Sequence, residues 1–262
     1  MNKLMIFFLL IPILIGHPYD DKVGKGLAMA YPTYQEDLSR AQVNWFYDWS
    51  SSHYDDPRYV PMSWCGADPE LPLSYSGYVL LFNEPELKSQ CNITSQQGID
   101  YYKSLQSKYP EAKWVVGNTI FWGSWQYWLN EFWDICHADP ACVMPEYWGV
   151  HVYLSGDART FIPFVKGELN KFHNKIGGIF WVTEFSEING NINTDRSLVK
   201  LYEDTPYIAR WAYFTNRSAP NDPWYLNGWR VDLFDWDTGE PTAIGNWYIG
   251  NMFDLFLSRI TK

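Results

Sequence analysis

Two apolar runs of five residues stand out along the chain, and a glutamate follows each of them within two residues. The first run covers residues 78–82 and leads into Asn83-Glu84-Pro85, and the second covers residues 179–183 and leads into Glu184. Short, uninterrupted, β-prone apolar runs are typical of parallel strands that are buried on both faces. Proline has no N–H for a sheet ladder, so the first strand should end before Pro85. The pattern therefore predicts two carboxyl groups at the carboxyl ends of two core strands.

Similar runs alternate with helical patterns about eight times, which predicts the α/β class and a single (β/α)8 TIM barrel. The predicted strands are Lys25–Ala30, Asn44–Tyr47, Tyr59–Met62, Tyr78–Phe82, Lys113–Gly117, Tyr147–Tyr153, Ile179–Thr183 and Trp229–Phe234. The predicted helices are Asp37–Ala41, Thr94–Tyr109, Ser124–His137, Phe161–Asn174, Leu198–Phe214 with a kink near Pro206, and Thr242–Phe256. A doubly wound open sheet is the alternative, but its Gly-rich phosphate turn does not follow the first strand.

The length and composition of the chain agree with a single domain of the size of a (β/α)8 barrel. The chain has 262 residues, and a barrel of this type needs about 250. Aromatic residues make up 19% of the chain, which suggests a groove of flat apolar faces that would suit sugar rings. The net charge of −10 argues against nucleic acid, because a phosphate backbone requires a basic surface.

The N-terminus has the pattern of a secretory signal. Residues 4–15 are continuously apolar and follow Lys3, and we expect cleavage near Gly16 or His17. The run is too short to span a bilayer comfortably, so we expect residues 1–16 to be a signal peptide and residues 17–262 to form the secreted domain. After cleavage we expect no membrane contact, and a monomer is the default.

Four cysteines suit an exported chain, in which they can oxidise. Cys136 and Cys142 are six residues apart and predict a local disulfide, which leaves Cys65 and Cys91 to pair with each other. A zinc site is the alternative, but no Cys-x-x-Cys motif or histidine cluster supports it. Glycosylation sequons begin at Asn92 and Asn216, and they matter only in a eukaryotic host.

A barrel presents catalytic groups at its strand ends. The residues found at the predicted ends are Asp48, Trp64, Glu84, Trp122, His151, Tyr153, Glu184 and Trp236. Two carboxyl groups that face each other at the open end of one barrel are the catalytic groups of a retaining glycosidase, in which one acts as acid and the other as nucleophile. Asn83 is placed to donate to a sugar hydroxyl, and Tyr153 or His151 to donate to Glu184.

Structural interpretations compete with these roles. A glutamate before proline is often a solvated turn residue, and Glu184 could be an ion-pair partner on a loop. Glu86 or Glu187 could be the real acid in either motif. His151 could be a core histidine, and most tryptophans are packing residues. Trp64 and Trp236 are better candidates for sugar contact because they follow predicted strands.

The motifs, taken together, resemble glycoside hydrolase family 128, the alkali-sensitive-linkage-type β-1,3-glucanases. The segments that carry the resemblance lie in the family's order and are Gly26-Leu27-Ala28, Asn44-Trp45-Phe46-Tyr47-Asp48-Trp49, Val60-Pro61-Met62-Ser63-Trp64, Leu81-Phe82-Asn83-Glu84-Pro85-Glu86, His151-Val152-Tyr153 and Trp181-Val182-Thr183-Glu184-Phe185. Asn-Glu-Pro occurs in many barrel glycosidases, whereas the ordered set is specific.

The resemblance implies a secreted or wall-associated enzyme that cuts β-1,3-glucan by the retaining mechanism, without a cofactor or metal. By position, Glu84 would be the acid/base and Glu184 the nucleophile. The family includes endo-acting, exo-acting and oligosaccharide-binding forms, and we expect an endo-β-1,3-glucanase. A non-hydrolytic glucan-binding protein and a barrel glycosidase for another β-glycan remain the alternatives. Cys65 replaces the glycine that usually follows the strand-three tryptophan, which suggests a disulfide beside the groove.

Overall fold

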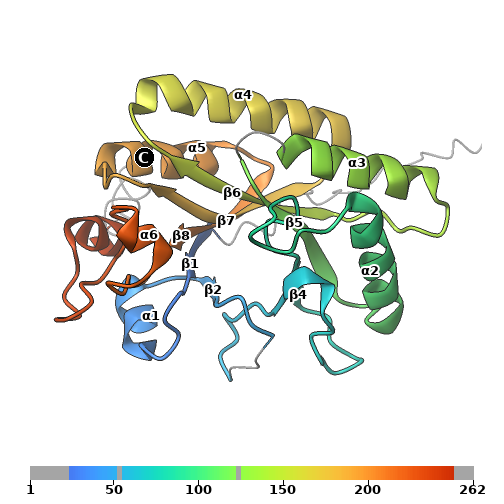
Figure 1. Ribbon diagram of the computed structural model, residues 1–262, viewed down its shortest axis with the longest axis horizontal. Coiled ribbons are helices and arrows are strands. Elements are labelled where there is room, and N and C mark those ends of the chain that lie inside the picture. Colours follow the sequence, from blue (N-terminus) through green and yellow to red (C-terminus); the bar gives the residue numbers. More distant parts are fainter. Residues whose placement is uncertain (1–23, 52–54, 122–124, 251–262) are drawn as a thin grey trace, which may run out of the picture.

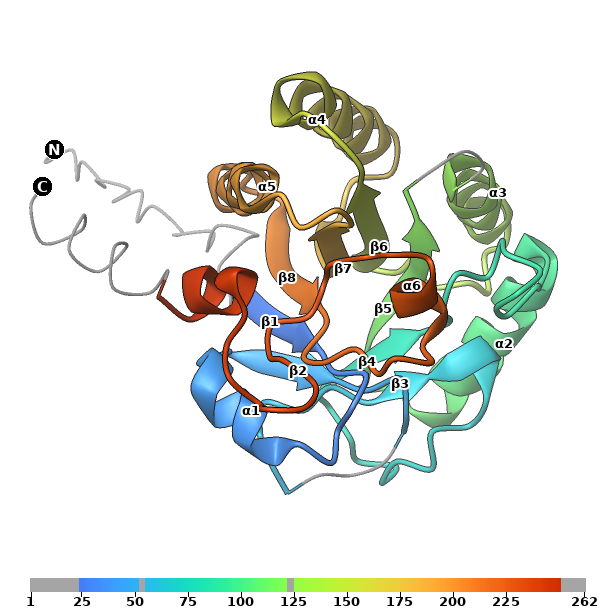
Figure 2. The same ribbon diagram turned by 60° about the vertical axis from the view of Figure 1, so that its left-hand side comes forward.

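A computed structural model of the chain describes residues 24–51, 55–121 and 125–250. Its eight strands form one parallel sheet in the order β2-β1-β8-β7-β6-β5-β4-β3 (Figures 1 and 2). The strands are β1 Gly24–Ala28, β2 Trp45–Tyr47, β3 Met62–Ser63, β4 Tyr78–Leu81, β5 Lys113–Ile120, β6 Tyr147–Leu154, β7 Ile179–Glu187 and β8 Ile208–Phe214. The predicted (β/α)8 barrel is confirmed. The proposed signal segment and Trp122 lie outside the described residues.

The barrel closes between β2 and β3 through a single parallel bridge that joins Phe46 to Tyr59. Backbone bonds from Phe46 N–H to Arg58 O (3.0 Å) and from Val60 N–H to Phe46 O (2.9 Å) support this bridge. Regular pairing with β4 starts only at Met62, so the third strand is shorter and later than the predicted range Tyr59–Met62. The seam between β2 and β3 is therefore the least regular part of the barrel wall.

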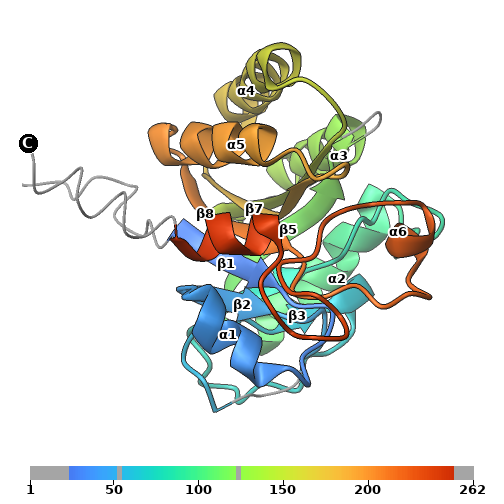
Figure 3. The same ribbon diagram turned by 90° about the vertical axis from the view of Figure 1, so that its left-hand side faces the viewer.

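Helices surround the strands on the outside (Figure 2). They are α1 Gln35–Ala41, the 3₁₀ turn η1 Trp64–Gly66, α2 Ser95–Lys108, α3 Trp125–Ala138, α4 Ala158–Ile176, α5 Ile192–Asp204 and the short α6 Pro223–Leu226. α2 begins with a complete capping box, in which Thr94 and Gln97 satisfy each other's backbone N–H groups. A further helix runs from residue 243 to the last described residue and lies between α1 and α5 (Figure 3).

The prediction for the eighth strand was wrong. The helix that starts after Asn191 ends at Asp204, before Pro206, and residues 208–214 form β8 instead of continuing the helix. The predicted strand Trp229–Phe234 is a loop segment whose backbone bonds to the end of β8, with Leu233 N–H donating to Thr215 O at 3.1 Å. Because β8 pairs with both β1 and β7, every residue in it is buried, and no alternation distinguished this strand from a buried helix.

Successive strand residues alternate between two cores. Inward side chains, such as those of Trp45, Leu80 and Trp181, fill the barrel, and outward ones, such as Phe46 and Val79, pack beneath the helices. At the bottom of the barrel the guanidinium of Arg210 lies 4.1 Å from the ring centre of Trp181. The described interior is thus filled largely with aromatic residues, as in a packed barrel core.

Both predicted disulfides are confirmed, Cys65–Cys91 and Cys136–Cys142. The two sequons differ, because Asn92 is exposed whereas Asn216 is fully buried and donates to Asp37 Oδ2 at 3.0 Å. Across residues 24–51, 55–121 and 125–250, no helix combines the length and apolar character that a membrane crossing needs.

Candidate active site

A cleft of about 530 Å³ opens at the carboxyl ends of the strands, and all eight strands or the residues just after them contribute to it. The loop after β8, which includes α6, passes across this end of the barrel (Figure 2). The lining residues are Ala30, Trp49, Trp64, Asn83, Glu84, Gln90, Ile120, Tyr153, Glu184, Phe214, Pro223, Trp224, Asn227 and Trp229. The cleft therefore combines two carboxyl groups with five aromatic side chains besides Phe214, which is the composition expected of a sugar-binding groove.

An irregularity in β7 turns Glu184 toward this cleft. Along the pairing of β6 with β7 the register shifts at Thr183, so that Glu184 lies opposite His151. Without the shift, simple alternation from Trp181 would point residue 184 outward, to the helix layer. Such bulges commonly re-aim a side chain next to an active site.

A second irregularity lies in β5 at Asn118, and the two irregular residues bond to each other. Thr183 Oγ1 donates to Asn118 Oδ1 at 2.9 Å, across the intervening strand β6. They meet because Gly149 of β6 has no side chain: a Cβ there would lie 2.0 Å from Asn118 Oδ1. The amide nitrogen of Asn118 donates to the carbonyls of Leu81 and Phe82, both at 3.1 Å. Asn118 thus connects the end of β4 to the point where β7 turns.

The end of β4 is an abrupt turn. Phe82 and Glu84 both adopt positive φ angles, 70° and 44°, which residues with a Cβ rarely occupy. The turn is held by Glu84 N–H, which donates to Asn118 O at 2.9 Å. The result is that the Glu84 side chain, 7% exposed, lines the cleft instead of continuing the strand direction.

Glu184 lies among hydrogen-bond donors. Tyr47 Oη and Trp49 Nε1 each donate to its Oε1 at 2.9 Å, and the hydroxyl of Tyr153 donates to its Oε2. The residue is 4% exposed. Three donors converging on a carboxyl group favour its ionised form, because only that form accepts at every oxygen lone pair.

His151 lies between the two glutamates, fully buried beneath the cleft. Its Nδ1 is 2.9 Å from Glu84 Oε1, and its Nε2 is 3.4 Å from Glu184 Oε1. One potential ligand atom from each of the three residues lies within 4.8 Å of the other two. Such a trio resembles a cation site, but the two ring nitrogens face different carboxylates, so the imidazole joins the glutamates instead of directing one lone pair to a shared point. The carboxyl separation suits retaining glycosidases, in which it is about 5–5.5 Å.

Burial and charge act in opposite directions on these groups. Burial raises the pKa of Glu184, and Glu84 adds to the rise, while His151 and the two tyrosine hydroxyls oppose it; the net shift is upward. Burial alone would lower the pKa of His151, but the charges of Glu184 and Glu84 and the bond to Glu84 outweigh it and raise that pKa. The two neighbouring carboxyl groups therefore favour the charged imidazolium form of His151.

The two alternative acids, Glu86 and Glu187, accept hydrogen bonds from backbone N–H groups and have structural roles. Glu187 is fully buried, and its oxygens accept from the backbone N–H groups of Gly156, Asn189 and Asn191, so it organises the loop after β7. Glu86 accepts from Ile120 N–H at 2.7 Å, and burial raises its pKa to about 7. Neither side chain lines the cleft.

The other predicted residues divide into two groups. Asn83, Trp64 and Tyr153 line the cleft, as expected. Asp48 does not: its Oδ1 accepts from Ser50 and Tyr59, on the outer side of β2. Trp236 was placed at the end of the wrong strand, and it packs against the ring of Tyr31 at 4.7 Å, away from the cleft.

The prediction missed Tyr47, Trp49 and Asn118. Tyr47 and Trp49 flank Asp48 in the sequence. Alternation along β2 could have identified them, because Trp45, Tyr47 and Trp49 share the face that points into the barrel. No local pattern marked Asn118, which the predicted strand Lys113–Gly117 left just outside.

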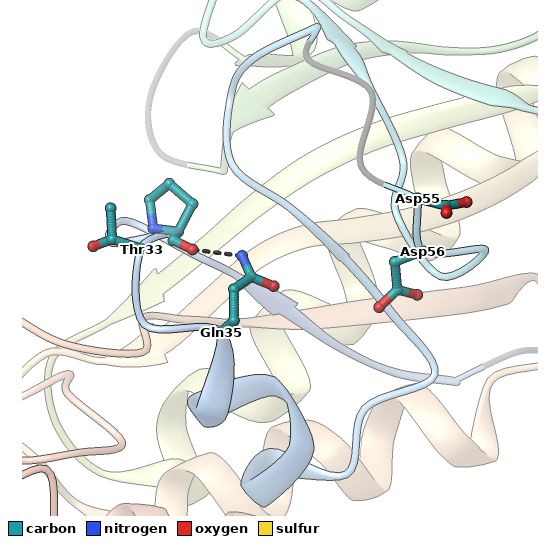
Figure 4. A pocket seen from close by; sticks show the side chains of 5 residues that line it. Thr33, Gln35, Asp55 and Asp56 are labelled. Carbon is teal, nitrogen blue, oxygen red and sulfur yellow. Dashed lines mark hydrogen bonds between the residues drawn. The ribbon is translucent and has the colours of Figure 1, made fainter.

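A second hollow, of about 570 Å³, is lined by Pro32, Thr33, Gln35, Asp55 and Asp56 (Figure 4). Its polar groups are engaged locally: Gln35 Nε2 donates to Pro32 O, and Asp56 Oδ2 receives Arg58 Nη2 at 2.7 Å. Its described lining includes no aromatic side chain, so the first cleft is the candidate active site.

Comparison with known proteins agrees with this site. Residues 26–248 match the family model described as the glycosyl hydrolase catalytic core. No curated protein matches the chain. A glycoside hydrolase family 128 endo-β-1,3-glucanase of subgroup I from Amycolatopsis mediterranei, solved with laminaritriose, is similar over 87% of this chain and 99% of its own, with a TM-score of 0.68 and 20% identity.

Two further solved structures of family 128 share the fold. A curdlan-specific exo-β-1,3-glucanase of subgroup III from Blastomyces gilchristii, in complex with glucose, has a TM-score of 0.65 and 21% identity and covers 88% of this chain and 99% of its own. A subgroup VII oligosaccharide-binding protein from Trichoderma gamsii has a TM-score of 0.64 and 17% identity and covers 92% and 97%. The fold of this chain is thus the one found in these family 128 structures, and the match across residues 26–248 shows that the chain belongs to the glycosyl hydrolase catalytic core family.

Proposed function

We propose that this protein is a secreted endo-β-1,3-glucanase that acts with retention of configuration, with Glu184 as nucleophile and Glu84 as acid/base. The observation that carries the proposal is the pair of carboxyl groups facing each other across His151 in one aromatic cleft. Their close approach favours attack by a carboxylate over attack by an interposed water, which requires about 6.5–9.5 Å.

The surroundings of the two glutamates support this division of roles. The three donors to Glu184 favour its anionic form and oppose the effect of burial, which suits attack on the anomeric carbon. Glu84 has His151 as its side-chain partner in the described structure and is free to pass a proton to the leaving oxygen. The covalent glycosyl-enzyme is then hydrolysed by a water that Glu84 deprotonates, and two inversions restore the original configuration.

The substrate class follows from the solved neighbours and the cleft. Enzymes of the same fold are described as endo- and exo-β-1,3-glucanases, and one was solved with laminaritriose. Trp64 and Gln90 on one wall, and Trp224 and Trp229 on the other, supply ring faces and an amide for a glucan chain. The two disulfides suit an oxidising extracellular compartment.

The deciding experiment is product analysis by chain length with purified protein on laminarin, next to mannan and xylan, with and without EDTA. If the protein is an endo-β-1,3-glucanase, it releases oligosaccharides of several lengths from laminarin and none from mannan or xylan. EDTA should leave the rate of release unchanged. Glucose as the sole early product indicates exo action, and binding without any product indicates a glucan-binding protein. Cleavage of mannan or xylan instead of laminarin would refute the substrate assignment.

A further inference from the structure

One wall of the cleft is attached to a disulfide. Trp64 and Gln90 both line the cleft, and each is the immediate neighbour of a cysteine in the same bond, Cys65–Cys91. Trp64 belongs to η1, after β3, and Gln90 belongs to the loop between β4 and α2. The disulfide thus joins two segments, 26 residues apart in sequence, at the point where each presents a side chain to the cleft.

The backbone beside Trp64 has an unfavourable conformation. Cys65 has φ 52° and ψ 25°, in the left-handed region, and this residue interrupts the regular geometry of η1. This conformation is unfavourable for a residue with a Cβ, because the Cβ comes too close to the following carbonyl oxygen. Trp64 itself is 41% exposed, so packing alone does not determine where its ring lies. A covalent bond at the next residue is therefore well placed to hold the ring at the cleft.

The position of the Gln90 side chain similarly depends on the adjacent Cys91. Its side chain accepts from Asn83 Nδ2 in a long bond of 3.3 Å, and its backbone N–H donates to Leu87 O at 3.1 Å. Glu84, by contrast, is fixed by contacts that do not involve the disulfide, namely those with Asn118 O and His151 Nδ1, both at 2.9 Å. Loss of the disulfide should consequently affect the wall much more than the acid.

We propose that the Cys65–Cys91 disulfide positions Trp64 and Gln90 as a sugar-binding wall, and that its reduction lowers affinity for β-1,3-glucan while leaving the chemical step nearly intact. This inference rests on the function proposed above. A dithiol such as dithiothreitol supplies two electrons and two protons, which break the S–S bond into two thiols, and the reagent leaves as a cyclic disulfide.

The second disulfide offers an internal control. Cys136 and Cys142 are buried, 1% and 9% exposed, at the end of α3, and neither adjoins a cleft residue. Cys65 and Cys91 are only partly buried, so a mild reductant reaches them first. The two bonds can be separated both by mutation and by timed reduction.

The test compares Cys65→Ser/Cys91→Ser with Cys136→Ser/Cys142→Ser on β-1,3-linked oligosaccharides of defined length. We expect the first pair to raise KM about tenfold, equivalent to 1.4 kcal/mol, with kcat changed less than about twofold, and the second to leave KM unchanged. Trp64→Ala should raise KM similarly, and adding it to the Cys65/Cys91 pair should produce little further change, because both act on one wall.

Titration calorimetry of a β-1,3-linked hexasaccharide is carried out with wild-type protein and with Glu184→Gln, before and after mild reduction. The variant should not turn the ligand over, so its heat measures affinity alone. Weakened binding without any hydrolysis would support this inference and refute the proposed enzyme. Unchanged KM and affinity once thiol labelling shows Cys65 and Cys91 reduced, or a fall in kcat at constant KM, would overturn the inference and leave the enzyme standing. If the serine variant fails to fold, the reduction experiment on wild-type protein decides alone.

Discussion

β7 continues as a regular strand for three residues beyond Glu184, whereas β4 has already ended at Leu81, three residues before Glu84. Glu184 is reached through a register shift against β6, inside a strand that is paired on both sides, and three side chains donate to it. Glu84 stands on a turn with two left-handed residues, and among the described residues its side chain has one hydrogen-bond partner, His151.

The difference matches two chemical tasks. A nucleophile must stay ionised and aimed at one carbon, which a rigid strand and several donors provide. An acid/base must exchange a proton twice in each cycle, and numerous donors that fix its charge would hinder that exchange. Under the proposed function, the difference between the two strand ends matches one group that holds a charge and another that moves a proton.

The largest effect should come from removing either carboxyl group. Glu84→Ala and Glu184→Ala are each expected to lower kcat on laminarin about a thousandfold or more, because each removes a group that the transition state requires. On an aryl β-glucoside with a good leaving group, Glu84→Ala should retain far more activity, because the aryl oxygen can leave with little protonation by an acid.

Azide separates the two roles by stereochemistry. With Glu84→Ala it should intercept the glycosyl-enzyme and give the β-azide, and with Glu184→Ala it should attack directly and give the α-azide, as NMR of the products can show. The opposite pairing of anomers and variants would reverse our assignment.

The connection between the two strand ends is the next target. Asn118→Ala and Gly149→Ala should each lower the free energy of unfolding by about 2–4 kcal/mol, the first by leaving buried carbonyls unpaired and the second by forcing Asn118 aside. Both should also lower kcat. Gly167→Ala in α4 is the control, because no atom lies within 4 Å of its added Cβ. Denaturant melts that show wild-type stability for Asn118→Ala would disprove its bridging role.

Removing one donor from Glu184 should have a smaller effect. Tyr153→Phe and Tyr47→Phe each remove a bond to a charged group, which is equivalent to about 1.5–3 kcal/mol, so kcat/KM should fall about 10- to 150-fold. The lost donors favoured the ionised form, so the acidic limb of the pH profile should move to higher pH while the basic limb stays in place. Tyr102→Phe, which loses a neutral bond in the helix layer, should leave the profile unchanged. A shift of the basic limb alone would argue that Glu184 is the acid.

The smallest effect concerns stability and pH. Burial raises the pKa of Glu86 to about 7 and that of Asp195 well above its ordinary value, so the folded protein keeps protons that the unfolded chain releases from about pH 4.5 upward. Stability should therefore fall as the pH rises through this window. Glu86→Gln should reduce the change in the free energy of unfolding across this pH range by at most about 3 kcal/mol. Glu111→Gln, at an exposed position, should leave the pH dependence unchanged. Guanidinium melts at about pH 5 and about pH 8 measure the slope, and equal stability at both would contradict the prediction.

The strands that alternate or end at a clear signal could be predicted from the sequence. Pro85 marked the end of β4, and the predicted helix Thr94–Tyr109 begins at the residue that caps α2. β8 could not be recognised, because a strand buried on both faces shows no period of two and its apolar run follows a helix after only three residues. Pro206 was the available signal, since a helix usually ends before a proline.

The site divides in the same way. Glu84 and Glu184 were identified from their places after apolar runs, and Tyr47 and Trp49 were accessible through alternation along β2. Asn118 was not, because its importance arises from contacts with Leu81, Phe82 and Thr183, which are distant in sequence. A residue that matters only through its partners leaves no local pattern.

The buried sequon has a consequence for biosynthesis. Asn216 and Arg217 hold Asp37 of α1 through three bonds, so the acceptor amide is enclosed once α1 docks. An oligosaccharyltransferase needs an extended acceptor peptide, and a chain modified at Asn216 would have lost the contact that attaches α1 to the end of β8. Molecules that reach the native state should therefore carry an unmodified Asn216, and a host that adds glycans would find its accessible acceptor at Asn92, one residue from Cys91 at the rim of the cleft.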